Sequence, residues 1–140
     1  MVLLKFKVCY FFKGFYMYLE VSSTVDKQIR PGMRARLISG AFPESSFGTG
    51  KCLTMEVSAY GWAIGELNIL DGLGNRVAHY HGNRRKNRDH IDWFTFARDL
   101  RPHQKRFVIE GVKGGITYYS AEGDIAIDDV KVFLGTCSKY

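Results

Sequence analysis

The most informative residues of the chain are Gly123-Asp-Ile-Ala-Ile-Asp-Asp-Val130, with Phe107-Val-Ile-Glu-Gly-Val112 before them and Gly135-Thr-Cys137 after them. Apolar and polar residues alternate through much of this region. Alternation with a period of two indicates strands that bury one face against a core. The last third of the chain is therefore expected to consist of β-strands joined by glycine-containing turns.

One irregularity interrupts this alternation. Ile125 and Ile127 share one parity, whereas Val130 and Val132 share the other. Residues of one parity lie on one face of a strand, so all four can face the core only if the register slips between them. A β-bulge at Asp128-Asp129 would supply that slip, because a bulge adds one residue to its strand.

The two adjacent carboxylates at this bulge are also candidate metal ligands. Carboxylate oxygens bind hard cations such as calcium, which makes Asp128 and Asp129 a candidate site. The alternative is structural: one aspartate accepts backbone N–H groups in the loop that it touches, and the other faces solvent. We therefore expect no cofactor, and calcium at this pair is the weaker alternative.

The period-two pattern extends back through the chain, and no window carries a helical stripe. The turn-forming segment Asp71-Gly-Leu-Gly-Asn75 predicts a β-hairpin between the strands on either side of it. About eight or nine short strands without helices favour an antiparallel sandwich or barrel, and we expect a two-sheet sandwich. The expected strands are residues 15–21, 35–38, 52–59, 65–70, 76–80, 93–96, 106–112 and 124–134.

Length and composition are those of one globular domain. The chain has 140 residues, of which 46% are hydrophobic, and it contains no Pro/Ser-rich linker. No apolar run is long enough to span a bilayer, so this chain is not expected to insert into a membrane. Met1–Phe12 is apolar, but Lys5 and Lys7 interrupt it and no cleavage site of small residues follows, so a signal peptide is not the preferred interpretation.

The net charge of +6 favours acidic partners, and two regions are candidate contact surfaces. Trp62 is a candidate anchor for a partner, although a tryptophan beside a strand end often belongs to the core. Asn83–Arg88 is a candidate site for an acidic glycan, although a solvated loop explains the same charges. Nucleic acid is not an expected partner. The basic candidates in the second region are Arg84, Arg85, Lys86 and Arg88, and the basic residues Arg98, Arg101, Lys105 and Arg106 follow them.

Cysteine and histidine do not show the spacing of a metal site. The chain has three cysteines, at positions 9, 52 and 137, and no C-x-x-C motif. His79 and His81 would share a strand face, but no third ligand converges on them in the sequence. A zinc site is therefore not expected.

Five blocks, in the right order, resemble the MAM domain family, which is named after meprin, A5 neuropilin and receptor tyrosine phosphatase mu. Trp93 stands where the family has a tryptophan after a turn. The blocks are Gly14-Phe-Tyr-Met-Tyr-Leu-Glu-Val-Ser-Ser23, Ala35-Arg-Leu-Ile-Ser39 with Phe42-Pro43, Cys52-Leu-Thr-Met-Glu-Val-Ser-Ala-Tyr-Gly61, Ile64-Gly-Glu-Leu-Asn68 and the C-terminal stretch quoted above.

The resemblance implies a fold, a disulfide and a location. The fold is a jelly-roll sandwich of the concanavalin A-like type, with the MAM-like domain at residues 14–137 and a tail at 138–140. Cys52 and Cys137 correspond to the third and fourth cysteines of the family, which form a disulfide, and such a bond implies an extracellular location. Residues 1–13 do not resemble the family's opening section, so Cys9 is expected to be free or intermolecular, and a calcium site would lack one ligand.

Three functional classes follow. The resemblance implies a non-catalytic adhesion or receptor module of a membrane-associated or secreted protein, whose partner is another protein or a second copy of itself. A carbohydrate-binding module of the same fold is the alternative. A glycoside hydrolase ranks last. Glu122, Asp124 and Asp128 have the parity to share a strand face, as paired catalytic carboxylates would. Residues four apart, such as Asp124 and Asp128, lie about 13 Å apart along an ideal strand, which is beyond the spacing that glycoside cleavage requires.

Overall fold

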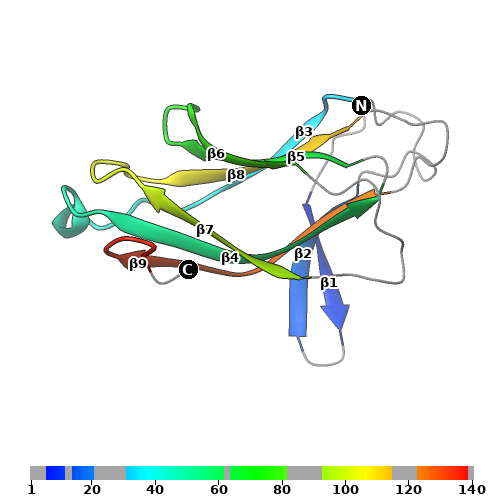
Figure 1. Cartoon of the computed structure of the whole chain (residues 1–140), viewed down its shortest axis with the longest axis horizontal. Helices are drawn as coiled ribbons and strands as arrows, with labels where there is room; N and C mark the ends of the chain where they lie inside the picture. The colour runs from blue at the N-terminus through cyan, green and yellow to red at the C-terminus, as the bar shows by residue number, and fades with distance from the viewer. Residues whose placement is uncertain are drawn as a thin grey trace.

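The chain folds into two β-sheets that lie face to face (Figure 1). The structure is a computed structural model, and it describes residues 6–11, 14–20, 31–61, 64–81, 93–114 and 123–138. Every strand pair within this part of the chain is antiparallel. The described residues contain no helix that is both long and apolar enough to cross a membrane. The prediction of an all-β, two-sheet sandwich is confirmed.

One sheet has five strands in the order β1-β2-β9-β4-β7, and the other has four in the order β3-β8-β5-β6. The first comprises β1 (Phe6–Phe11), β2 (Gly14–Glu20), β4 (Lys51–Gly61), β7 (Phe94–Leu100) and β9 (Gly123–Leu134). The second comprises β3 (Arg34–Ile38), β5 (Ile64–Asp71), β6 (Arg76–His81) and β8 (Phe107–Lys113). A short 3-10 helix, η1 (Glu44–Ser46), precedes β4.

The core lies between the two sheets and is built from the inward parity of each strand. Leu53, Met55 and Val57 of β4 are buried there, and Leu67 and Ile69 of β5 are buried in the same cluster. Fully burying one such side chain stabilises the fold by roughly 1.5–3 kcal/mol. The apolar residues that alternate along each strand in the sequence are therefore the ones that form the core between the two sheets.

A bulge is present in β9, but at Asp129-Val130, one residue later than the Asp128-Asp129 pair expected from the sequence. Glu56 of β4 lies opposite Asp128 and Thr54 lies opposite Lys131, so that a single β4 residue faces two residues of β9. Asp129 adopts a positive φ of 49° at this point. After the bulge Val132 packs against the core, whereas Val130 lies in the bulge and is 41% exposed. The slip in register thus restores one of the two later valines to the core and leaves the other at the surface.

The hairpin between β5 and β6 is also confirmed, and a buried aspartate organises its turn. The carboxylate of Asp71 accepts hydrogen bonds from Leu73 N at 2.9 Å, Asn75 N at 2.9 Å and Asn75 Nδ2 at 3.1 Å. Burial opposes ionisation and raises the pKa of Asp71, but these hydrogen bonds, with the positive charge of Arg101, outweigh it and lower the pKa below its ordinary value.

Asp71→Asn should make the acid unfolding of the domain less steep. The folded pKa lies below the unfolded value of about 3.9, so the carboxylate stabilises the fold fully above about pH 4. This contribution is lost as the pH falls through the folded pKa. Urea unfolding between pH 3 and 7 should show the variant to be about 1 kcal/mol less stable at neutral pH, with the difference shrinking in acid. A difference that is constant with pH would contradict this account.

Part of the segment that does not resemble the family nevertheless forms a strand. β1 pairs along its whole length with β2, from Phe6 opposite Leu19 to Phe11 opposite Gly14. β1 is therefore an edge strand of the five-stranded sheet, and Figure 1 shows it beside β2. The domain boundary at residue 14 stays a prediction, because this pairing says nothing about which residues are needed for folding.

Candidate functional site

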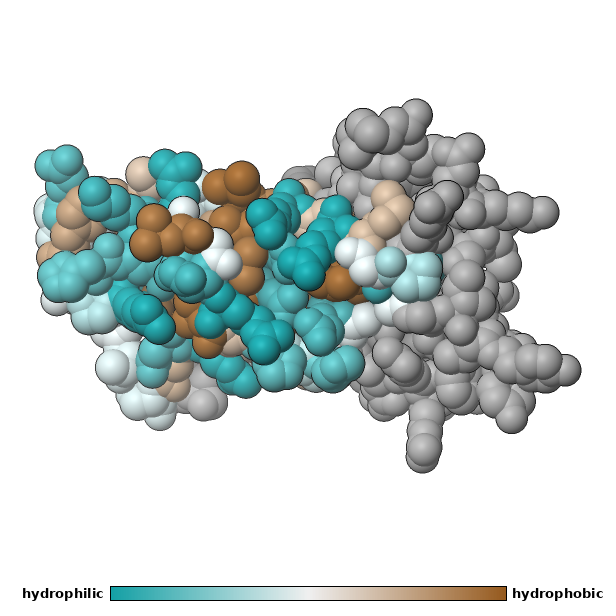
Figure 2. Space-filling view, turned by 90° about the horizontal axis from the view of Figure 1, so that it is seen from above, coloured by the Kyte–Doolittle hydropathy of each residue, from teal (hydrophilic) through white to brown (hydrophobic). Residues whose placement is uncertain are grey.

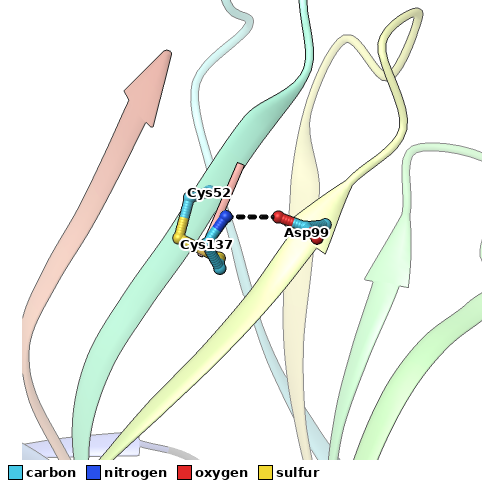
Figure 3. A group of neighbouring side chains, drawn as sticks. All are labelled: Cys52, Asp99 and Cys137. Atoms are coloured by element: carbon cyan, nitrogen blue, oxygen red, sulfur yellow. Dashed lines mark hydrogen bonds between the residues drawn. A yellow bond between two sulfur atoms is a disulfide. The ribbon is translucent and has the colours of Figure 1, made fainter. Parts of the chain in front are cut away.

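A disulfide joins β4 to the segment that follows β9. Cys52 and Cys137, which are 85 residues apart in sequence, are bonded with their Cα atoms 5.0 Å apart. The backbone N–H of Cys137 donates to Asp99 Oδ1 of β7 at 2.7 Å (Figure 3). This is the pair that the resemblance implies. The bond connects the segment after β9 to β4, an interior strand of the five-stranded sheet.

The same three residues are the one group in the described part of the chain whose side chains converge as metal ligands do. Their ligand atoms lie within 4.8 Å of one another, but the two sulfur atoms are bonded to each other. Cysteine binds a metal as a deprotonated thiolate, which a disulfide does not provide. In its oxidised form this group is therefore a structural crosslink.

The candidate calcium ligands engage in local contacts. Asp128 Oδ1 accepts the backbone N–H of Asp129 at 2.7 Å, and Asp129 Oδ2 pairs with Lys131 Nζ at 2.7 Å. Both carboxylates are exposed. The first contact corresponds to the structural alternative, in which one aspartate holds a backbone N–H group. No third metal-ligating residue converges on this pair within the described ranges.

Of the remaining candidate residues, only Asp124 and Asp128 lie in the described part of the chain. Asp124 and Asp128 lie four residues apart on β9, where they oppose Tyr60 and Glu56. Their third partner in the glycoside hydrolase hypothesis, Glu122, lies outside the described residues. The candidate partner-binding residues Trp62, Arg84, Arg85, Lys86 and Arg88 also lie outside the described residues.

A buried lysine, which was not predicted from the sequence, fixes two loops at one end of the sandwich. Lys51 is 1% exposed, and its Nζ donates to Ser46 O at 2.9 Å, Thr49 O at 3.1 Å and Pro102 O at 3.2 Å. The ammonium also lies 5.3 Å from the ring centroid of Phe42. The lysine has the same parity as the core residues of β4, which is the signal that could have identified it.

A second feature not predicted from the sequence is a charged network on the outer face of the four-stranded sheet. Glu110 of β8 accepts from Arg36 Nε at 2.7 Å, Arg34 NH1 at 3.5 Å and Asn68 Nδ2 at 3.2 Å. Asn68 lies on the face opposite to the core residue Leu67, and Glu110 lies directly across from it. Although it lies on this outer face, Glu110 is only 1% exposed.

The network continues toward β6. Glu66 pairs with Arg76 at 3.7 Å and with His81 at 3.5 Å. Arg34, Arg36 and Arg76 remain 59%, 49% and 53% exposed, so their outer surfaces stay accessible. Figure 2 views the molecule from this side, where hydrophilic residues surround smaller apolar patches. We call Arg34, Arg36, Glu66, Arg76, His81 and Glu110 the charged sheet face.

Two solved structures share the fold. The K1 cleaved adhesin domain of Lys-gingipain from Porphyromonas gingivalis W83 matches 94% of this chain and 85% of its own, with a TM-score of 0.67 and 16% identity. A CBM4 structure matches 93% of this chain and 78% of its own, with a TM-score of 0.51 and 17% identity. At these identities the likeness shows the fold alone.

Sequence relatives are closer. MAM domain-containing glycosylphosphatidylinositol anchor protein 2 of Homo sapiens is 34% identical over 145 aligned residues, and MAM domain-containing protein 2 of Homo sapiens is 30% identical over 127. These alignments cover 91% and 90% of this chain but only 13% and 17% of the relatives. The family model of the MAM domain, meprin/A5/mu, matches residues 11–138. The chain therefore belongs to the MAM domain family.

Proposed function

We propose that this domain binds a protein partner through the charged sheet face and has no catalytic role. Domains of this family are extracellular, and the chain is an extracellular module of the adhesion type. Its relatives are much longer proteins, so the domain is expected to act as one part of a membrane-associated or secreted protein. The partner is another protein or a second copy of the domain.

The observation that carries this proposal is that side chains of the charged sheet face are held in place by hydrogen bonds within the domain. Glu110 holds Arg36 in a charge-assisted hydrogen bond from a buried position, so the guanidinium is fixed before any partner arrives. A side chain that is ordered in advance loses less entropy on binding. Arginine is also enriched at protein interfaces, where its planar group binds carboxylates with two hydrogen bonds.

The arrangement of charge supports a protein partner with complementary groups. Arg34 and Arg36 lie on edge strand β3, Arg76 and His81 lie on edge strand β6, and the carboxylate of Glu66 lies between them. Complementary charge steers association and excludes partners with the wrong pattern. Because both signs are present, two copies of this face can also pair with each other.

Reversing two charges, Arg34→Glu with Arg76→Glu, should reduce adhesion at least tenfold. Both arginines are exposed, and the variant keeps Arg36, whose Nε lies 2.7 Å from buried Glu110, so it should remain folded, as thermal unfolding would check. The two substitutions replace attraction by repulsion at any acidic partner surface. Beads coated with the secreted protein would be tested for aggregation with one another and for adhesion to cells. The matched control is Arg98→Glu with Lys131→Glu, which changes the net charge equally at exposed positions outside this face.

The cell measurement would be repeated after protease treatment and after treatment with glycosaminoglycan lyases. Adhesion that is lost with protease, survives the lyases and falls only in the Arg34/Arg76 variant supports the proposal. Aggregation of the beads with one another would show that the partner is a second copy. Adhesion that survives protease, or that both variants reduce equally, would overturn the proposal of a protein partner.

A further inference from the structure

A cleft at one end of the sandwich is lined by basic side chains. Its volume is about 640 Å³, and its walls are the β5–β6 turn, Asp71 to Leu73, and the β7–β8 loop, Arg101 to Arg106. In Figure 1 this turn and this loop lie at the same end of the molecule. Ligand sites in proteins commonly enclose 300–1,000 Å³, so the cleft has the size of a binding site.

The surface that lines the cleft is mostly apolar, and basic residues predominate among its charged residues. Arg101, Lys105 and Arg106 line it with exposed side chains, and His103 joins them. Asp71 is the only acidic residue among the described residues that line it. Its carboxylate is buried and accepts three hydrogen bonds within its own turn, so little of its charge faces a ligand. A cleft of this composition favours a polyanion.

Hydrogen bonds from other parts of the domain and from a buried glutamine hold the β7–β8 loop in place. Gln104 is buried, its Oε1 accepts Arg101 N at 3.3 Å, and its Nε2 donates to Arg106 O at 3.1 Å. Pro102 O accepts Lys51 Nζ at 3.2 Å, and Lys105 O accepts Phe42 N at 2.7 Å. The basic side chains therefore extend from a fixed backbone, which lowers the entropy lost when a ligand orders them.

The opposite wall adds apolar surface. Gly72 has no side chain, and a Cβ at this position would meet Arg106 Cγ at 3.0 Å, so the stem of Arg106 lies against the turn. Leu73 is 89% exposed beside it. Basic groups beside apolar surface suit a ligand that has both anionic groups and hydrocarbon faces.

We propose that this cleft binds a sulfated glycan chain. The cations are spread along one loop rather than gathered around one point, which fits an extended polyanion better than a single phosphate. Guanidinium groups bind tetrahedral oxyanions with two hydrogen bonds, and sugar rings supply the hydrocarbon faces. No residue that lines the cleft belongs to the charged sheet face, so the inference adds a second ligand to the proposed protein partner and does not depend on it.

The test is binding of the secreted protein to heparin oligosaccharides in solution, measured calorimetrically at several salt concentrations. Lys105→Ala with Arg106→Ala should weaken binding at least tenfold and should reduce the slope of log Kd against log salt by about two, one for each cation removed. Arg34→Ala with Arg76→Ala removes the same charge from the charged sheet face and should change binding less than threefold. Thermal unfolding would confirm that both variants are folded.

Four results would overturn the inference. The first is absence of heparin binding by the unaltered protein, and the second is equal weakening in the two double variants, which indicates diffuse charge. The third is binding that falls only when Arg84 and Arg85 are replaced by alanine, which assigns the glycan to that segment. The fourth is tighter binding of poly-glutamate than of heparin, which indicates an acidic peptide. None of these measurements involves a protein partner, so they leave the adhesion proposal to its own test.

Discussion

Replacing Cys52 and Cys137 together by alanine should lower the free energy of unfolding by about 4 kcal/mol. The bond closes a loop of 85 residues, and a crosslink across so long a loop removes much conformational entropy from the unfolded chain. A typical domain has only about 5–15 kcal/mol of stability, so the variant should be close to unfolding at body temperature. Equilibrium unfolding in urea would measure the loss.

Two controls separate the crosslink from other effects. Reducing the unaltered protein with dithiothreitol should produce the same loss as the double substitution, because both open the same loop. Cys9→Ala should leave stability unchanged, since the Cys52–Cys137 bond persists in that variant and non-reducing peptide mapping would detect it. A loss below about 1 kcal/mol in the double variant would mean that the unfolded chain retains structure across the loop, against the entropic account.

The sheets were predictable because their determinants are local. The alternation of Leu53, Met55 and Val57 records which side of β4 faces the core, and this information does not depend on the partner strand. The same logic located the bulge in β9, since Ile127 and Val132 differ in parity and can face the core together only if the strand gains a residue between them. The Asp71–Asn75 turn was predictable from its glycines and from an aspartate able to bind its own backbone.

The surfaces were not predictable, because they depend on residues distant in sequence. Glu110 has the parity of a surface residue, and it is buried because Arg34 and Arg36 of β3 cover it. The basic cleft exists only where the turn at Asp71 meets the loop that ends at Arg106. The sequence shows the basic residues Arg101, Lys105 and Arg106 after the Arg84–Arg88 block, but nothing in either segment indicates that this loop meets the turn at Asp71.

Lys51→Met should lower the free energy of unfolding by about 3 kcal/mol. Methionine fills a similar volume, so the main change is the loss of the donor to Ser46 O, Thr49 O and Pro102 O. Removing a buried charge also removes the cost of its desolvation, which favours the variant. We expect the loss of hydrogen bonds to outweigh this gain in the free energy of unfolding, because the three carbonyls stay in the protein interior without their charged partner. The loops that carry these carbonyls also lose the contact that joins them. Urea unfolding would measure this difference.

Lys105→Met is the matched control, because it removes the same ammonium from an exposed position in the β7–β8 loop, which Lys51 contacts at Pro102 O, and it should change stability by less than about 0.5 kcal/mol. Hydrogen exchange would locate the effect of Lys51→Met. The amide of Gly48, which bonds to Pro102 O, and the amide of Gln104, which bonds to Arg101 O, should exchange faster in that variant only. Unchanged exchange at both amides, or equal destabilisation by the two substitutions, would show that the lysine does not hold the loops together. In that case the backbone beneath the basic cleft would be held by Gln104 and by the hydrogen bond from Phe42 N to Lys105 O.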